Sequence, residues 1–175
     1  MSIKNLLLVS LLAMSGCASI DVERYRAERP ELRLEEYFNG TLDAWGMFQK
    51  RDGEVLKRFK VVVEASWTGN RGVLDEHFTY SDGSTQRRVW HITKTADNQY
   101  QGEADDVVGI ARGVVAGNAL HWAYTLRLPV DGKEYAVVFD DWMYLQEDGV
   151  LLNRSVMKKF GFKLGEVTLF FRKRP

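Results

Sequence analysis

GNALHWAYTLRLPVDGKEYAVVFDDWMYLQEDGVLLN, residues 117–153, is the stretch from which the fold can be inferred. Its first part carries apolar side chains at every second position, the spacing at which strand residues share one face. These positions are Leu120, Trp122, Tyr124, Leu126 and Leu128. The pair Asp131-Gly132 follows, and both residue types tolerate the positive φ that a two-residue hairpin turn requires. The stretch therefore predicts two antiparallel strands joined by a tight turn.

The turn type predicts which residues face each other across this hairpin. A two-residue turn places Trp122 opposite Asp141, so a carboxylate lies on the apolar face. A second Asp-Gly pair, at 148–149, predicts a third strand whose register places Arg154 diagonally next to Asp141. An ionised Asp on an apolar face is unfavourable unless it is paired, so we predict an Asp141–Arg154 ion pair inside a mostly hydrophobic interior. A one-residue shift of register would cancel this prediction.

The start of the chain is typical of an export signal. In residues 1–16, Lys4 precedes the apolar run LLLVSLLA, which is too short to span a bilayer as a helix. The sequence MSGC at 14–17 resembles the lipobox of bacterial lipoproteins, whose cysteine is acylated and becomes the first residue of the mature protein. Cys17 is the only cysteine, which fits a lipid attachment site and excludes an internal disulfide. The alternative is an ordinary secretory signal with a chance cysteine.

The residue after Cys17 bears on localisation. It is Ala18 rather than an aspartate, and by the lipobox resemblance this implies sorting to the outer membrane. Several acyl chains, each contributing roughly 0.8 kcal/mol per buried methylene, would hold the protein on a bilayer. We expect a lipid-anchored protein of the bacterial outer membrane whose domain faces the periplasm.

Removal of the leader leaves a chain suited to a single domain. It leaves 159 of the 175 residues, with 23 basic and 24 acidic side chains, because the leader holds one basic residue and no acidic one. Basic residues are scattered rather than clustered, so we expect no nucleic-acid partner. Residues 17–36 are polar and predict a tether, and residues 37–175 predict one domain. Within 30–38 we expect one or two helical turns that cap the domain with Leu32, Leu34, Tyr37 and Phe38.

The rest of the chain alternates in the manner of strands. About ten segments, near 41–50, 55–68, 73–81, 86–94, 99–105, 110–116, 119–130, 133–146, 150–159 and 163–172, are separated by short turn signals such as Asp-Gly. Sequential hairpins without long crossovers predict an all-β, antiparallel up-and-down barrel of about 8–10 strands, lipocalin- or calycin-like, with a short N-terminal helix. An open sheet or a sandwich is the alternative.

The first hairpin allows two registers. A two-residue turn at Asp52-Gly53 sets Met47 against Arg58, whereas a three-residue loop sets Met47 against Phe59 and Trp45 against Val61. We favour the second, because Gly53 can then occupy the left-handed position of a bulge.

Several blocks of the sequence resemble a known family. They are YFNGTLDAWGMF (37–48), GEADDVVGIARGVVAGNALHWAYTL (102–126), FDDWMYL (139–145) and NRSVMKKFGFKLGEVTLFFRK (153–173). These blocks are similar to an uncharacterised family of bacterial lipoproteins, domain of unknown function thirty-eight thirty-three, and the resemblance covers nearly all of the mature chain. It implies a lipocalin-like barrel on a lipid anchor, and it implies no activity.

The sequence offers little for catalysis. Adjacent carboxylates at 105–106 and 140–141 point to opposite faces of a strand, so Asp141 could meet Asp105 or Asp106 only across the interior. The three histidines have no ligand spacing, and no phosphate loop or serine-hydrolase elbow occurs. Glycines at 109, 113 and 117 are typical of bends or bulges in strands. We therefore expect no enzyme, no metal and no cofactor; an enzyme using Asp141 with Arg154 is the less favoured reading.

Two functions remain open for such a barrel. Bulky side chains on the inner face could line a cavity for a small apolar ligand such as a lipid, or they could fill the interior as plain core. The predicted ligand-binding residues are Trp122, Tyr124, Phe139, Asp141, Met143 and Arg154. The leading hypothesis is a lipoprotein that binds or carries this ligand, with the membrane as partner through Cys17. The alternative is a filled barrel with a structural or assembly role through an unknown protein partner.

Overall fold

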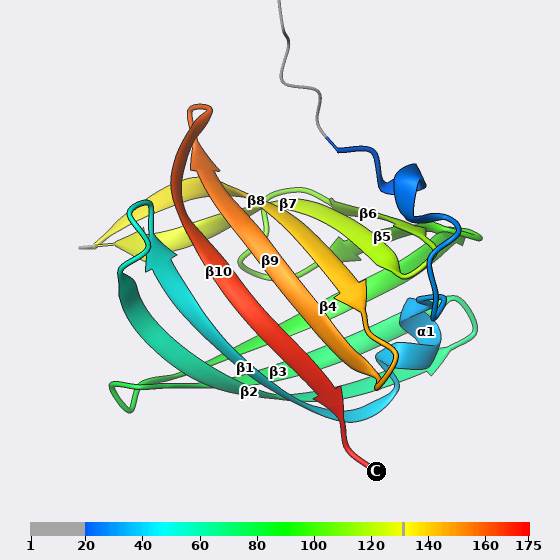
Figure 1. Ribbon diagram of the computed structural model, residues 1–175. Helices are drawn as coiled ribbons and strands as arrows, with labels where there is room; N and C mark the ends of the chain where they lie inside the picture. Colours follow the sequence, from blue (N-terminus) through cyan, green and yellow to red (C-terminus); the bar gives the residue numbers. More distant parts are fainter. Residues whose placement is uncertain (1–19, 131) are drawn as a thin grey trace, which may run out of the picture.

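The chain forms a closed antiparallel barrel (Figure 1). The computed structural model describes residues 20–130 and 132–175, so the predicted signal peptide 1–16, Cys17 and Asp131 lie outside the described residues. Within this part of the chain the strands are β1 (Gly40–Lys50), β2 (Val55–Thr68), β3 (Arg71–Tyr80), β4 (Thr85–Ala96), β5 (Gln99–Glu103), β6 (Ala111–Ala116), β7 (Ala119–Val130), β8 (Lys133–Leu145), β9 (Val150–Lys159) and β10 (Phe162–Lys173). Each strand pairs with its neighbours in sequence, and β1 pairs with β10. The predicted all-β up-and-down barrel is confirmed.

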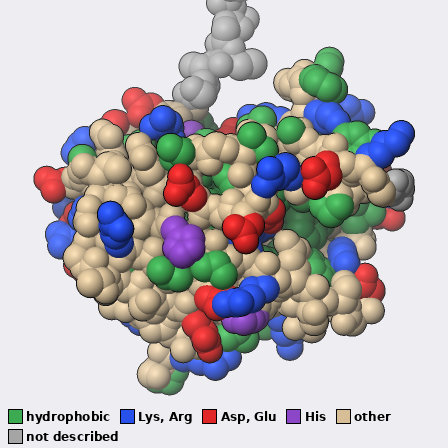
Figure 2. All heavy atoms as spheres, turned by 180° about the vertical axis from the view of Figure 1, so that it is seen from behind, with side chains coloured by type: hydrophobic (Ala, Val, Ile, Leu, Met, Phe, Trp, Pro, Cys, Tyr) green, Lys and Arg blue, Asp and Glu red, His purple; other side chains and the backbone are tan. Residues whose placement is uncertain are grey.

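The alternating strands bury one face and expose the other. Along β2, Val61 and Val63 are buried while Lys60 and Glu64 are exposed. Closure satisfies the hydrogen-bonding groups that two free edges would leave open. On the outside, acidic and basic side chains are interspersed, as Figure 2 shows for one face.

The β7–β8 hairpin has the predicted register. Val130 pairs with Lys133, and Trp122 lies opposite Asp141. Gly132 has a φ of 75°, as a two-residue turn requires. The carboxylate of Asp141 therefore points into the barrel, and this residue is 6% exposed.

The β8–β9 hairpin differs from its predicted register by one residue. Asp141 lies opposite Ser155, and Arg154 lies opposite Trp142 on the outer face. The cause is the turn: Gln146 and Val150 close a loop of three residues, with Gly149 at a φ of 77° in its last position. Because side chains alternate along a strand, this shift turns Arg154 outward.

The β1–β2 register is also shifted by one residue from the one we favoured. Met47 lies opposite Arg58 rather than Phe59, and the pairing of Trp45 moves with it. Gly53 adopts the expected left-handed conformation, with a φ of 92°. A bulge close to the turn then changes the pairing, and the turn residues alone do not predict it.

The segment before β1 packs against the barrel. A 3-10 turn, η1 (Val22–Tyr25), lies against β6 and β7, and α1 (Leu34–Tyr37) lies at one end of the barrel (Figure 1). Leu32, Leu34 and Phe38 are buried in the main core, as the sequence predicted for this cap. The tether predicted for 17–36 is wrong for its described part, because Val22 is also buried.

The two ends of the barrel differ in what covers them. The segment 32–38 closes one end, which we call the closed end. The turns of the β1–β2, β3–β4, β7–β8 and β9–β10 hairpins lie at the opposite end, which we call the open end. None of the helices in the described part of the chain has the length and apolar character needed to cross a membrane.

Candidate functional site: a cavity inside the barrel

The barrel encloses a cavity of about 690 Å³. It begins above Leu34 and Phe38 at the closed end and reaches the exposed residues Pro129 and Glu134 at the open end. A barrel of this many strands is wider than its own side chains can fill, so the N-terminal segment plugs one end and the space remains in the rest. Its volume lies in the range of small-molecule sites, about 300–1,000 Å³.

Aromatic rings form one wall of the cavity. Trp90 packs edge-on against both Trp122 and Tyr124, with ring centroids 5.7 Å and 5.3 Å away. Tyr124 stacks on Phe139 at 5.1 Å, and the pairing of β7 with β8 sets these two residues opposite each other. These contacts hold the rings in fixed positions against β4, β7 and β8.

Two glycines make room for this aromatic wall. A Cβ on Gly113 would lie 2.3 Å from the ring of Trp122, and a Cβ on Gly102 would lie 2.6 Å from the same ring. We expected Gly113 to mark a bend or bulge, as its neighbours Gly109 and Gly117 do with positive φ angles. Gly113 instead allows the ring of Trp122 to lie flat against β5 and β6.

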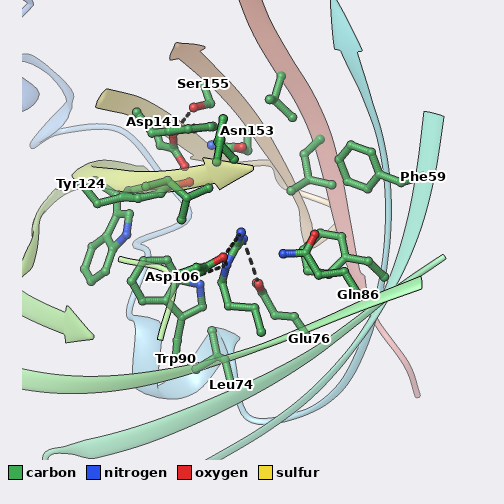
Figure 3. Close-up of a pocket in the computed structure, with 18 of the residues that line it drawn as sticks. Phe59, Leu74, Glu76, Gln86, Trp90, Asp106, Tyr124, Asp141, Asn153 and Ser155 are labelled. Atoms are coloured by element: carbon green, nitrogen blue, oxygen red, sulfur yellow. Dashed lines mark hydrogen bonds and ion pairs between the residues drawn. The ribbon is translucent and has the colours of Figure 1, made fainter. Parts of the chain in front are cut away.

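A charged cluster lies in the middle of the cavity (Figure 3). Arg88 of β4 donates two hydrogen bonds from Nε and Nη2 to Asp106, at 2.9 and 2.8 Å to Oδ2. Glu76 of β3 lies directly opposite Arg88 in the sheet, with its Oε2 3.7 Å from Nη1. Among the described residues, this Oε2 is buried without a hydrogen-bond partner.

The Arg88–Asp106 pair also joins two parts of the wall. β4 pairs with β5 only from His91 onward, so no strand pairing covers its first half on that side. The connection between β5 and β6 fills this place: it bonds to β7 through the backbone of Asp106 and Val108. The first half of β4 is therefore joined to the segment between β5 and β6 by side chains, Arg88 and Asp106, instead of by backbone hydrogen bonds.

A third carboxylate enters the cavity from the opposite side. Asp141 accepts a hydrogen bond from the hydroxyl of Ser155, its partner across β8 and β9. Asn153 lines the same side of the cavity, and Figure 3 shows Asp141, Asn153 and Ser155 facing the Glu76 side. Glu76, Asp106 and Asp141 thus bring three carboxylates to the centre of the cavity beside the guanidinium of Arg88.

Burial changes the protonation of these groups. Desolvation raises the pKa of Glu76 to about 7, although Arg88 acts to lower it. Desolvation likewise raises the pKa of Asp141 to about 7, against the hydrogen bond from Ser155. Burial alone would lower the pKa of Arg88, but its hydrogen bonds to Asp106 and the charge of Glu76 raise it. Near neutral pH the site holds one fixed cation beside two carboxyl groups that exchange protons.

The neighbouring Asp140 lies on the outer face of the same strand, and its environment changes its pKa in the opposite direction. It points outward, where it accepts bonds from Lys158 at 2.7 Å and from His121 at 2.8 Å. Burial would raise the pKa of Asp140, but these two partners hold it below its usual value. On this outer face His121 stacks on Trp142, with the ring centroids 4.6 Å apart.

The structure brings most of the predicted ligand-binding residues together. Trp122, Tyr124, Phe139, Asp141 and Met143 all line the cavity. Arg154 does not: the predicted Asp141–Arg154 ion pair is wrong, because the three-residue turn places Arg154 outside, where it pairs with Glu166. The side chain of Arg154 is 63% exposed.

Glu76 and Arg88 were not predicted as interior charges, although strand alternation, the rule that places Asp141 inside, applies to them as well. Glu76 alternates with Leu74 and Phe78 on β3, and Arg88 alternates with Trp90 on β4, so both are charges on apolar faces. The reasoning that placed Asp141 inside would have placed these two inside as well. Asp106 was considered only as a partner across the interior, and it does line the cavity with Asp141.

A metal centre finds no support in this arrangement. Across residues 20–130 and 132–175, no three His, Cys, Asp or Glu side chains form a group that could hold a metal ion. His77 contacts Asp75 on the outside of β3, and His121 contacts Asp140, far from any third ligand.

Comparison with known proteins identifies a family. A family model described as "Protein of unknown function (DUF3833)" matches residues 11–173. No curated protein matches the chain. Among solved structures, the chain is similar to a de novo designed fluorescence-activating β-barrel, at 13% sequence identity and a TM-score of 0.45, covering 82% of this chain and 99% of that one.

Proposed function

The chain belongs to the DUF3833 family, and we propose that its barrel binds a small, largely apolar molecule such as a lipid in the bacterial periplasm. The observation that carries this proposal is the cavity of about 690 Å³ with its aromatic wall and a few polar groups. Ligand sites have this mixture, since apolar walls supply affinity and a few polar groups fix orientation.

The open end gives such a molecule a route in. The cavity reaches Pro129 and Glu134 near the tip of the β7–β8 hairpin, whereas Leu34 and Phe38 close its other end. A ligand would therefore enter between the hairpin tips and stop against the N-terminal segment.

Binding without turnover is the simplest role for this site. Hydrogen bonds from Arg88 hold Asp106, a hydrogen bond from Ser155 holds Asp141, and the described residues place no histidine or cysteine among the cavity-lining side chains. We therefore propose a carrier or binding protein rather than an enzyme. Its anchor would be an acylated Cys17 in the outer membrane.

Two measurements test this function. Native mass spectrometry of the purified protein should show one bound small molecule per chain, released on unfolding. A fluorescent apolar probe should bind at a one-to-one ratio and be displaced by a long-chain alcohol. An empty protein that takes up no probe would contradict the proposal.

The anchor has a separate test. Cells fed an alkyne-labelled fatty acid should label the wild-type protein, and Cys17→Ser should abolish the label. A label that persists in Cys17→Ser would place the acylation elsewhere, and its absence from both proteins would contradict an anchor.

The second candidate function rests on the outer surface. Trp45 and Phe170 lie side by side in the β1–β10 register and expose their rings beside a groove bounded by β1, β2, β3 and β10. Such a patch favours a protein partner. Crosslinking in intact envelopes through Trp45 would recover one recurrent protein if this role exists.

A further inference from the structure

The charges inside the cavity limit what can bind there. At the centre of the cavity, Glu76, Asp106 and Asp141 face the cation Arg88, whose Nε and Nη2 already donate hydrogen bonds to Asp106. Arg127 also lines the cavity, but it is exposed and donates to the backbone carbonyl of Asp105. An anionic head group would have to approach Arg88 between Glu76 and Asp141. Repulsion by like charges in a medium of low dielectric constant opposes this approach. A free fatty acid is therefore a poor match to the centre of the cavity.

The unsatisfied atoms of the cavity are acceptors. Oε2 of Glu76 is buried and, within the described residues, has no hydrogen-bond partner. Asp141, on the opposite side of the cavity, accepts a bond from Ser155 at Oδ1. A buried acceptor without a donor is unfavourable, and a ligand that supplies the donor removes that penalty.

We propose that the ligand carries a positively charged, hydrogen-bond-donating head, a primary amine or a related organic cation, held between Glu76 and Asp141. Its apolar part lies along the wall formed by Trp90, Trp122 and Tyr124. This inference rests on the proposed function, because it names the ligand class for the same cavity.

Binding of a cationic head group should depend on pH, because Glu76 and Asp141 would lose protons when it binds. The pKa of Glu76 and of Asp141 is raised to about 7 by burial, and a bound cation would lower both. The charged and titratable groups that face them include Arg88, Asp106, Tyr80 and Tyr124. Of these, Tyr124 stays neutral because burial raises its pKa, and Arg88 stays charged. An amine should therefore bind more tightly as the pH rises, with release of protons.

Three probes with the same chain separate the head groups: decylamine, decanol and decanoate. Each is titrated calorimetrically into the purified wild-type protein, below its micelle concentration, at about pH 6 and about pH 8. We expect decylamine to bind at least about tenfold more tightly than decanoate at the higher pH. Its affinity should fall at the lower pH, whereas that of decanol should stay nearly constant.

Variants locate the head group. Glu76→Gln and Asp141→Asn should each weaken decylamine binding by about tenfold and leave decanol binding within about twofold. The control is Glu64→Gln, an exposed carboxylate on the outer face of β2, which should change neither. Circular dichroism identifies a variant that fails to fold, and the other variant then carries the test.

The outcomes distinguish this inference from the proposed function. Equal or tighter binding of decanoate, equal binding of decylamine and decanol, or an amine affinity unchanged in both variants would overturn the cationic head group and leave the apolar cavity standing. A protein that binds none of the three probes would overturn the proposed function itself.

Discussion

The closed and open ends of the barrel are made from the same strands, yet their interiors differ. At the closed end Leu42 and Leu151 are fully buried, and Phe38 from the N-terminal segment meets Phe171 edge-on at 5.5 Å. Toward the open end the same inner faces surround a cavity that holds Glu76 and Asp141. Packing alone would favour filling both halves, because empty space forfeits contacts. The open half thus keeps a cavity that close packing alone does not explain.

The largest expected effect tests the charges of the open half. Arg88→Met removes the cation that donates to Asp106 and lies beside Glu76, and leaves these buried carboxylates without a positive partner at the centre of the cavity. We expect a loss of about 3–5 kcal/mol in the free energy of unfolding, measured in urea at neutral pH.

The matched substitution outside the barrel is Arg154→Met. Its partner is Glu166 and its side chain is 63% exposed, so we expect a loss below about 1 kcal/mol. Equal losses in the two variants would show that the interior cluster contributes no more than a surface pair.

A pair of leucines compares the packing of the two ends. Leu151→Ala empties a fully buried site at the closed end and should lower the free energy of unfolding by about 3 kcal/mol. Leu128→Ala, at the half-buried rim of the cavity, should lower it by about 1 kcal/mol, because this side chain already borders open space. Equal losses would mean that the open half is packed as densely as the closed half.

The pH dependence of stability has a sign that distinguishes a carboxyl group whose pKa is raised on folding from one whose pKa is lowered. In the folded state the pKa of Glu76 and of Asp141 is raised to about 7, above the values of 4.5 and 3.8 for exposed groups. Their protonated forms favour folding at low pH, and this stability is lost as the pH rises through about 7. Asp141→Asn should therefore match the wild type near about pH 4 and exceed it by about 1–3 kcal/mol near about pH 8.

Asp43, a carboxylate on the outer surface, should change stability with pH in the opposite direction. The hydrogen bonds from Arg174 lower the pKa of Asp43, so the stability that this group contributes is present at neutral pH and is lost in acid. Asp43→Asn should reduce stability at neutral pH and match the wild type in acid. If Asp141→Asn followed the same curve, its carboxyl group would be ionised and paired, contrary to the structure.

A small effect is expected at the cap of the closed end. The hydroxyl of Tyr37 lies 3.0 Å from the carbonyl oxygens of Gly149 and Phe171 and donates to them. Tyr37→Phe should lower the free energy of unfolding by about 1 kcal/mol and leave ligand affinity unchanged. A change in affinity would mean that the closed end shapes the ligand site as well.

Much of the barrel could be predicted from the sequence because strand periodicity and turn residues are local. The alternation around Trp122 and the turn ending at Gly132 are sufficient to place Asp141 inside. The β8–β9 turn has the same Asp-Gly pair but a three-residue loop, and the sequence alone does not distinguish a two-residue turn from a three-residue one. One residue of register then decides that Arg154 lies outside and that Ser155 meets Asp141.

The cavity itself could not be predicted in this way. Whether an inner face is filled depends on the width of the closed barrel and on how far the plug reaches, and both are properties of the whole chain. Gly102 and Gly113 illustrate the difficulty, since their role becomes visible only when the ring of Trp122 lies against them. The segment containing Val22 was likewise read as a tether because its contacts are with distant strands.

The central claim, that the open half of the barrel is a ligand site, has one direct test. Trp90 and Trp122 line the cavity, so a brominated long-chain alcohol bound there should quench tryptophan fluorescence. We predict saturable quenching at one molecule per chain, and its reversal by an excess of the unbrominated alcohol of the same length. Quenching that rises linearly without saturation, or that the unbrominated alcohol does not reverse, would contradict the claim.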